Sequence, residues 1–443
     1  MTDPIQVICE NTGAAIEVPM GTTLLDVQRR LMPACDHPCL AAYVNNRTKE
    51  LNYRIYTPVT VRFLDITSFE GIRVYQRTVS FVLQKAVQEL WPDRRLHIRH
   101  SMGSNGFYCE VSGIDEFTDG QIDRLRDHML KLVGRDLPIR RTKALTEQVR
   151  SLYAAYGFED KIALLDTRPR LYSELYTIDG MPGYFYGSLA PSTGYVGLFD
   201  LQRYYNGFYI ALPLRSDPSR LNRTIHQEKM FDIFQEYQSW VRIMGVPTVG
   251  QLNSKVLGGD ASELIKIAEA FHEKKIASVA DAVYDANVAR GARVVLISGP
   301  SSSGKTTFAK RLGIQLRILG LNPVLISLDD YFVEREKTPL DENGEYDYEA
   351  LEAIDLAQFN DHLRRLAEGE SVDIPRYDFI TGTRQWHNNP LTLDERSILI
   401  IEGIHALNPR LTPSVPEERK FRVYISCFTS VAVSYTHLRA HET

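Results

Sequence analysis

The stretch Gly299-Pro300-Ser301-Ser302-Ser303-Gly304-Lys305-Thr306 decides the fold of the C-terminal part of this chain. It matches the pattern G-x-x-x-x-G-K-[ST], and it lies between an apolar run at 294–297 and a helix predicted over 307–319. Glycines let the backbone curl so that consecutive N–H groups point at phosphate oxygens, and the helix N-terminus adds to this attraction. The spacing therefore predicts a phosphate-binding loop between a buried strand and a helix.

The chemistry of such a loop assigns roles to its side chains. Lys305 is predicted to reach the β- and γ-phosphates of a nucleotide, and the Thr306 hydroxyl is predicted to ligate Mg²⁺. The residues expected to bind ATP are Gly299, Ser301, Ser302, Ser303, Gly304, Lys305, Thr306 and Thr307.

Two acidic residues follow predicted strands. Asp329 comes after the strand at 324–326, and ligands bind at this end of the strands in doubly wound sheets. Asp329 can therefore accept a proton from an attacking hydroxyl or help to hold Mg²⁺, and the alternative is an aspartate that caps the following helix. Glu402 follows the buried strand at 398–401, which is the usual place of a metal-supporting carboxylate; a glutamate without a catalytic role is the alternative.

Length and composition bound the class of protein. The chain has 443 residues, of which 44% are hydrophobic and 24% charged, so a disordered or fibrous chain is excluded and two to four domains are expected. The net charge of −5 argues against nucleic-acid binding by bulk charge. No apolar run approaches the roughly 20 residues that span a bilayer. The five cysteines and the N-terminus, which has no secretion signal, predict a cytoplasmic protein.

Changes in pattern along the chain predict its domains. Strand, strand, helix, strand and strand signals within 1–67 are a β-grasp pattern, and 68–220 indicates a mixed α+β domain. Residues 221–290 are predicted to be a helical connector. Uninterrupted apolar strands within 291–428 predict a doubly wound parallel sheet around the phosphate loop. The predicted fold class is therefore a multidomain α/β protein.

Further motifs in the C-terminal part resemble the uridine kinase/phosphoribulokinase family of P-loop kinases. They are Ser327-Leu328-Asp329, Pro375-Arg376-Tyr377-Asp378-Phe379 and Ile401-Glu402-Gly403-Ile404. The resemblance implies transfer of the γ-phosphate of ATP to a nucleoside 5′-hydroxyl, with Mg²⁺ held by the acidic group of the last motif. It also implies a general base at Asp329, a base-stacking ring at Tyr377, ribose contacts at Asp347 or Glu349, and a basic residue at Arg384.

Two departures from this family stand out. Pyrimidine nucleoside kinases carry a histidine that reads the base edge five residues after the stacking tyrosine, and here that position is Gly382. The family also continues past the segment around Tyr424 into a lid helix with phosphate-binding arginines. We expect a truncated kinase domain, with 429–443 a non-native tail.

The N-terminal half resembles threonyl-tRNA synthetases. Residues 5–64 look like a TGS domain, and 70–210 are similar to the editing domain that follows it, with matching pieces at 86–93, 105–108 and 190–194. The four catalytic positions of that domain correspond here to Arg77, Phe81, Phe185 and Leu189. None of these is a metal ligand or a base, so we expect no editing chemistry. The order of the parts resembles bacterial nucleoside kinase fusion proteins.

Two features of the middle region have competing interpretations. Many aromatic residues lie between 184 and 209, and we favour core packing of strands over a nucleic-acid surface. His97 and His100 flank Arg99 in a basic stretch, for which a solvated face is expected and RNA contact is the alternative.

Three functions remain open from the sequence. The leading prediction is an ATP-dependent nucleoside kinase with a small-molecule nucleoside as partner and no membrane contact. A second keeps the P-loop kinase but changes the acceptor to another hydroxyl compound, such as a sugar phosphate or a vitamin. A third is an RNA- or nucleotide-sensing module without turnover, although we favour packing or regulation over RNA binding for the N-terminal half. The oligomeric state is left open.

Overall fold

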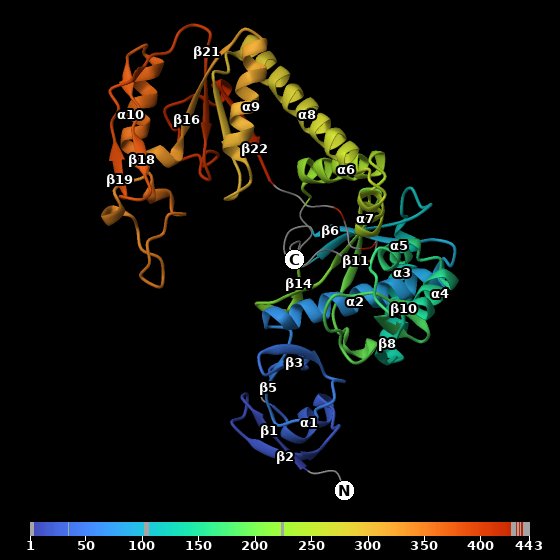
Figure 1. The fold of residues 1–443 in the computed structure, drawn as a ribbon. Helices are drawn as coiled ribbons and strands as arrows, with labels where there is room; N and C mark the ends of the chain where they lie inside the picture. Colours follow the sequence, from blue (N-terminus) through green and yellow to red (C-terminus); the bar gives the residue numbers. More distant parts are fainter. Residues whose placement is uncertain are drawn as a thin grey trace. The chain divides into compact units, whose positions relative to one another are not determined.

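The computed structural model describes residues 4–33, 35–101, 106–222, 226–426, 431, 434 and 436. Backbone contacts divide the chain into two compact units, Met1–Ser262 with Ser430–Thr443, and Glu263–Thr429. Figure 1 shows the elements of both units. The finer boundaries drawn from the sequence stay predictions, and most of the expected tail at 429–443, like Asn105 of the motif at 105–108, lies outside the described residues.

The first unit begins with a β-grasp sheet, as predicted. Its elements are β1 (Pro4–Cys9), β2 (Ala15–Pro19), α1 (Leu24–Leu31), β3 (Ala41–Val44), β4 (Arg47–Glu50) and β5 (Val59–Leu64). The strand order is β2-β1-β5-β3-β4, with β1 and β5 parallel at the centre. The helix begins where it does because the Thr23 side chain accepts a hydrogen bond from Asp26 N at 3.1 Å. Leu24 and Val27 on its inner face join the core of this sheet.

A larger α+β region follows in the same unit. Its first sheet has the order β11-β12-β7-β6 and its second the order β10-β9-β8. The elements are α2 (Phe69–Leu90), β6 (Leu96–Ser101), β7 (Gly106–Val111), α3 (Asp119–Gly134), β8 (Ile139–Leu145), α4 (Thr146–Ala155), α5 (Glu159–Asp166), β9 (Tyr172–Ile178), β10 (Met181–Gly183), β11 (Asp200–Tyr204), β12 (Gly207–Ala211), β13 (Pro213–Leu214) and β14 (Asp217–Leu221). Helix α2 begins at Phe69 because Ser68 caps it by accepting from Gly71 N at 3.1 Å.

The aromatic residues of this region mostly pack inside it. Tyr204, Phe208 and Tyr209 on strands β11 and β12 are at most 1% exposed, together with Tyr108 on β7. Tyr186 is an exception, with 48% of its surface exposed. The prediction of core packing is therefore confirmed for most of these rings.

The predicted solvated face around His97 and His100 is wrong. His100 is 4% exposed and stacks on Phe234 with ring centroids 3.7 Å apart, and neither of its ring nitrogens has a hydrogen-bond partner among the described residues. Arg99 forms an ion pair with Glu110 at 2.7 Å. The stretch belongs to strand β6, whose alternate side chains are buried by the sheet and by helix α6 (Glu228–Ile243). The basic composition of this stretch therefore did not indicate a solvent-exposed face.

Helices predominate between 228 and 290, as expected. Helix α6 is followed by α7 (Val249–Leu257) and α8 (Ala261–Arg290). Phe231 of α6 belongs to an aromatic core of the first unit, whereas Ile276, Ala280 and Val283 of α8 pack in the second unit. None of the helices in the described part of the chain is long and apolar enough to cross a lipid bilayer.

The second unit is built on a parallel sheet with the order β16-β21-β15-β22. Its main elements are β15 (Val294–Ser298), α9 (Lys305–Ile318), β16 (Asn322–Ser327), α10 (Leu356–Ala367), β21 (Ser397–Glu402) and β22 (Lys420–Tyr424). Short pairs complete it: β17 (Val372–Asp373) with β20 (Pro390–Leu391), and β18 (Arg376–Asp378) with β19 (Thr383–Gln385).

Helices cover both faces of this sheet (Figure 1). Val294 and Leu296 share a core with residues of α10, and their neighbours Val295 and Ile297 share a core with residues of α8 and α9. Because alternate side chains of a strand point to opposite faces, both faces are apolar and the strands read as uninterrupted hydrophobic runs. The predicted doubly wound sheet is confirmed.

The buried His100 and the partly buried His97 predict a loss of stability in acid. Burial lowers the pKa of His100 to about 4 and that of His97 to about 3, from an ordinary 6.5. As the pH falls below 6.5, these histidines bind protons in the unfolded chain but not in the folded chain. The free energy of unfolding therefore decreases between pH 6.5 and pH 4, by about 1.4 kcal/mol per pH unit for each histidine.

Replacing His100→Phe keeps the ring stack on Phe234 and removes one titrating group. We expect the urea midpoint of this variant to fall less than that of the wild type between pH 7 and pH 5. The exposed His387→Gln serves as the control and should follow the wild type. A parallel loss in His100→Phe and wild type would contradict the assignment.

Candidate active site

Three parallel strands bring the candidate site together at one edge of the sheet. Strands β15, β16 and β21 end side by side, and Glu402 at the end of β21 lies in register with Ile297 on one side and Ser327 on the other. Its carboxylate is nearly inaccessible to solvent, with 4% of the residue exposed. Oε1 of Glu402 accepts hydrogen bonds from Thr306 Oγ1 at 2.8 Å and Ser327 Oγ at 3.0 Å. These two hydrogen bonds connect the end of strand β21 to the phosphate loop and to the end of β16.

The loop before α9 has the backbone expected of a phosphate cradle. Ser302 and Gly304 have φ angles of +58° and +85°, a region that favours glycine, and α9 begins directly at Lys305. A Cβ atom at Gly299 would lie 2.1 Å from the carbonyl oxygen of Ile425, so only glycine fits there. All eight residues predicted to bind ATP lie in this loop or in the first turn of α9.

The side chains of the loop suit a nucleotide and a magnesium ion. Lys305 Nζ donates to Pro300 O at 3.0 Å, which curls the lysine back over its own loop. The Thr306 hydroxyl and the Glu402 carboxylate are the hard oxygen ligands that Mg²⁺ prefers. The residues present therefore fit MgATP, with a cation and backbone N–H groups for the phosphates and two oxygen donors beside them.

Asp329 lies at the same edge, in the short 3-10 helix η2 (Leu328–Tyr331) that follows β16. The surrounding protein displaces water from its carboxyl group and thereby raises the pKa, the negative charge of Glu402 raises the pKa further, and Lys305 opposes both. Its alternative role as a helix cap finds no support, because Asp355 caps the next α-helix by accepting from Gln358 N at 3.0 Å.

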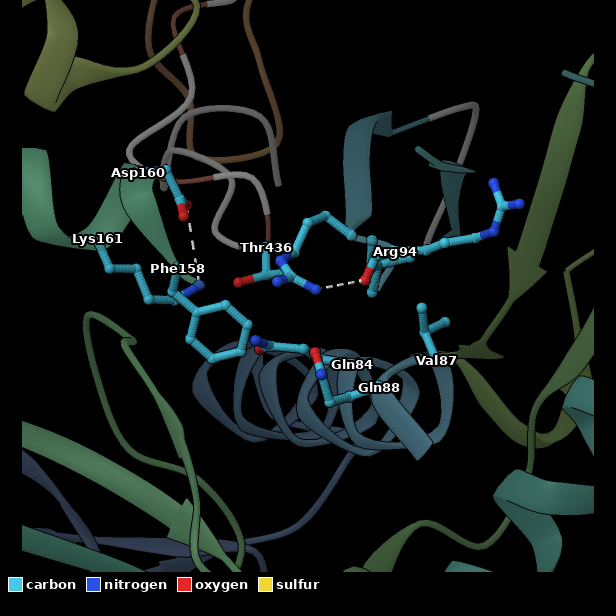
Figure 2. Close-up of a pocket in the computed structure, with 10 residues that line it drawn as sticks. Gln84, Val87, Gln88, Arg94, Phe158, Asp160, Lys161 and Thr436 are labelled. Carbon is cyan, nitrogen blue, oxygen red and sulfur yellow. Dashed lines mark hydrogen bonds and ion pairs between the residues drawn. The ribbon is translucent and has the colours of Figure 1, made fainter. Parts of the chain in front are cut away.

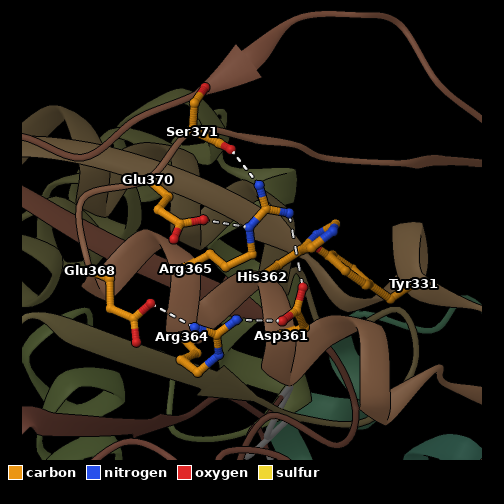
Figure 3. A network of polar contacts seen from close by, with 8 residues as sticks. All are labelled: Tyr331, Asp361, His362, Arg364, Arg365, Glu368, Glu370 and Ser371. Carbon is orange, nitrogen blue, oxygen red and sulfur yellow. Dashed lines mark hydrogen bonds and ion pairs between the residues drawn. The ribbon is translucent and has the colours of Figure 1, made fainter.

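The turn that carries Asp329 is held from two sides. Asp330 Oδ1 accepts a hydrogen bond from Tyr377 N at 3.3 Å. The fully buried Tyr331 shares a hydrogen bond of 2.9 Å with Nδ1 of His362 on helix α10 (Figure 3). Burial raises the pKa of the Tyr331 hydroxyl and lowers that of His362, so both groups are neutral near pH 7. These contacts fix the position of the neighbouring Asp329.

The residues predicted to bind the acceptor do not all have free side chains. Tyr377 is 5% exposed on strand β18. Asp347 Oδ1 accepts from the backbone N of Glu349 at 2.9 Å and so stabilises a turn, whereas the Glu349 side chain is exposed. Arg384 forms an ion pair with Asp355 at 3.1 Å. The substrate contacts of these residues stay predictions. The ion pair with Asp355 gives Arg384 a structural role.

Sequence reasoning missed the other residues beside Tyr377. Phe332 and Phe379 flank it, with ring centroids 5.6 Å and 5.0 Å from that of Tyr377, and the Tyr348 ring packs against Phe332 with centroids 5.8 Å apart. We call these four rings the aromatic wall. The position of Phe332, three residues after Asp329, was the one available signal. Ser327 belongs to a motif quoted from the sequence, but its hydrogen bond to Glu402 was not predicted.

The four editing-like positions in the first unit form part of its core. Phe81 and Phe185 pack with ring centroids 5.1 Å apart, and both belong with Leu189 to one cluster of buried residues. Arg77 Nε donates to the backbone carbonyl of Ser188 at 3.1 Å. These side chains offer neither a metal ligand nor a general base.

A small pocket in the first unit lies beside helix α2 (Figure 2). It is lined by Gln84, Val87, Gln88, Arg94, Arg95, Leu96, Phe158, Asp160, Lys161 and Thr436. Lys161, 2% exposed, lies 3.8 Å from a carboxylate oxygen of Asp160 and 4.3 Å from the centre of the Phe158 ring. Carboxylate and ring together compensate the buried ammonium group, which gives these residues a structural role.

Comparison with known proteins finds relatives of both halves of the chain. Residues 294–436 match the sequence model of the Phosphoribulokinase / Uridine kinase family. The N-terminal region is similar to threonine–tRNA ligases, at 28% identity over 190 residues for Rubrobacter xylanophilus and 26% over 204 residues for Bacillus velezensis. These matches cover 43% and 45% of this chain but only 29% and 31% of the ligases.

Solved structures with partial similarity include two kinases. A possible uridine kinase from Bacillus stearothermophilus is 28% identical, with 30% of this chain and 71% of that chain covered and a TM-score of 0.26. A D-glycerate 3-kinase from Cryptococcus neoformans is 19% identical, with 30% and 52% covered and a TM-score of 0.22. The predicted resemblances to this kinase family and to threonyl-tRNA synthetases are confirmed by the sequence matches, and the C-terminal part of the chain is similar to P-loop kinases. The TGS assignment stays a prediction.

Removing the Tyr331 hydroxyl should destabilise the second unit. In Tyr331→Phe the buried His362 nitrogen loses its partner, and we expect the free energy of unfolding to fall by about 1–3 kcal/mol in urea titrations. Arg364→Ala on the same helix is the control. Its half-exposed side chain pairs with Asp361 and Glu368 (Figure 3), and because solvent screens such pairs its loss should leave the free energy of unfolding close to that of the wild type. Equal effects of the two substitutions would contradict this account.

Proposed function

We propose that the protein is an ATP-dependent kinase that transfers the γ-phosphate of ATP to the 5′-hydroxyl of a nucleoside. One observation carries the proposal: Glu402 holds the hydroxyls of Thr306 and Ser327 at the same sheet edge where Asp329 has a raised pKa. A phosphate loop, a metal-supporting acid and a candidate base therefore meet at one point. Phosphoryl transfer depends mainly on such positioning and on charge neutralisation.

The nucleotide side of the reaction follows from the loop. Lys305 and the N–H groups between 301 and 307 would hold the phosphates of ATP. Thr306, Glu402 and Asp329 would hold Mg²⁺, which neutralises charge on the phosphoryl group during transfer.

Asp329 would accept the proton of the attacking hydroxyl. A general base works best when its pKa lies close to the working pH. Burial and the neighbouring Glu402 shift the pKa of Asp329 in that direction, and Lys305 opposes both.

The aromatic wall supports a flat acceptor such as a nucleoside. Base–aromatic stacking stabilises bound bases by about 1–3 kcal/mol each. Tyr377 is tied through its backbone to Asp330, so a base against the wall would bring its sugar towards Asp329. Asp347 or Glu349 would then contact the ribose. Another small hydroxyl compound is the second candidate, since Gly382 supplies no side chain to read a base.

For the first unit we propose a retained scaffold that packs against or regulates the kinase. The apolar core at the four editing-like positions supports this role over tRNA editing. The four cysteines in the described part of the chain are free thiols, which supports a cytoplasmic location. An RNA- or nucleotide-sensing module without turnover is the competing proposal.

The test is transfer of labelled γ-phosphate from MgATP to a panel of nucleosides, sugar phosphates and vitamins. Lys305→Ala should abolish transfer. Asp329→Asn should lower kcat by about 100- to 10,000-fold while ATP affinity stays close to that of the wild type. Transfer only to compounds other than nucleosides would contradict the nucleoside as acceptor and support the second candidate. ATP binding without transfer to any compound, together with salt-dependent tRNA binding, would favour the sensor.

A further inference from the structure

The space beside Gly382 is filled by the side chain of Arg335. Gly382 has a φ angle of +73°, and a Cβ atom added to it would lie 2.8 Å from Nε and 2.9 Å from Cβ of Arg335. The backbone N–H of Arg335 also donates to Gly382 O at 3.0 Å. A larger side chain at 382 would displace the arginine, so the glycine and the arginine form a matched pair.

Two hydrogen bonds hold the guanidinium group of Arg335 at the aromatic wall. Nε donates to the Tyr348 hydroxyl at 3.3 Å, and Nη2 donates to the backbone carbonyl of Phe379 at 2.6 Å. Phe379 is 56% exposed, so the wall has an open side. The hydroxyl of the buried Tyr377 has no hydrogen-bond partner in the part of the chain that the structure describes. The wall therefore presents a cation beside an exposed ring, whereas the Tyr377 hydroxyl is buried.

Arg335 and Arg384 differ in their partners. Arg384 is neutralised by Asp355. Arg335, by contrast, forms no ion pair with any carboxylate among the described residues, although the Asp378 carboxylate lies close enough to interact with its charge, and its Nη1 group has no hydrogen-bond partner there. A guanidinium group stays protonated and only donates hydrogen bonds. Its free N–H groups are available to a hydrogen-bond acceptor on a bound ring.

We propose that Arg335 determines which nucleoside is accepted, by donating to a carbonyl oxygen on the ring edge. The inference rests on the proposed nucleoside kinase function. An oxo group at the ring position that faces Arg335 accepts a hydrogen bond from the guanidinium group. An amino group at the same position is also a donor, so neither it nor the guanidinium N–H would have an acceptor. The structure thus assigns the substrate class as oxo-bases in preference to amino-bases.

Matched nucleosides test this assignment. Uridine and cytidine differ in an oxo or amino group at the same ring position, and so do inosine and adenosine. We expect the full chain to show kcat/KM values about tenfold or more higher for the oxo member of whichever pair it phosphorylates. In Arg335→Gln, whose amide can donate or accept, the ratio should fall to within about threefold.

Further variants separate specificity from folding. Arg335→Lys keeps the charge but loses the planar fork, and should give an intermediate ratio through a higher KM for the oxo-nucleoside. Lys337→Gln replaces an exposed cation in the same 3-10 helix, η3 (Arg335–Lys337), and should keep the wild-type ratio. ATP affinity should be unchanged in all three variants, since Arg335 lies outside the phosphate loop.

The outcomes distinguish the two proposals. Equal turnover of oxo- and amino-nucleosides by the wild type, or an unchanged ratio in Arg335→Gln with normal ATP affinity, would overturn the role of Arg335 and leave the kinase proposal standing. Transfer to none of the four nucleosides would overturn both.

Discussion

The candidate site depends on one buried carboxylate. Glu402 stands on the strand between β15 and β16, so its side chain reaches the phosphate loop on one side and the end of β16 on the other. Removing a carboxylate from water is costly unless hydrogen bonds compensate it, and the hydroxyls of Thr306 and Ser327 supply these bonds. A parallel sheet makes the arrangement available, because all three strands end at the same edge.

The acceptor side depends on a second set of constraints. Asp329 and Asp330 are adjacent, yet their environments separate their roles. Asp330 holds the backbone of Tyr377, and Tyr331 anchors the turn to His362, which leaves Asp329 as the carboxylate facing the open edge. The exposed ion pairs of helix α10 shown in Figure 3 contribute little to this positioning, because solvent screens them.

The sequence predicted the parts of the site that are local in the chain. The phosphate loop, Asp329 and Glu402 each follow an apolar strand, and parallel pairing alone brings them together. Arg335 could not be predicted, since its place beside Gly382 depends on the path of more than forty intervening residues. The pairing of Arg384 with Asp355 has the same origin. For His97 and His100 the alternating burial of a strand outweighed their polar composition.

Several charged side chains of the first unit form ion pairs, whereas Asp329 of the second unit lies near a second carboxylate. In the first unit, Arg99 pairs with Glu110 and Lys161 with Asp160, and the editing-like positions Phe81 and Phe185 are apolar. In the second unit, Asp329 has no ion pair among the described residues although a second carboxylate raises its pKa. An arrangement of two like charges at a sheet edge opposes folding, so its presence favours a functional role over a structural one. This criterion supports the proposal that the chemistry takes place at the sheet edge of the second unit.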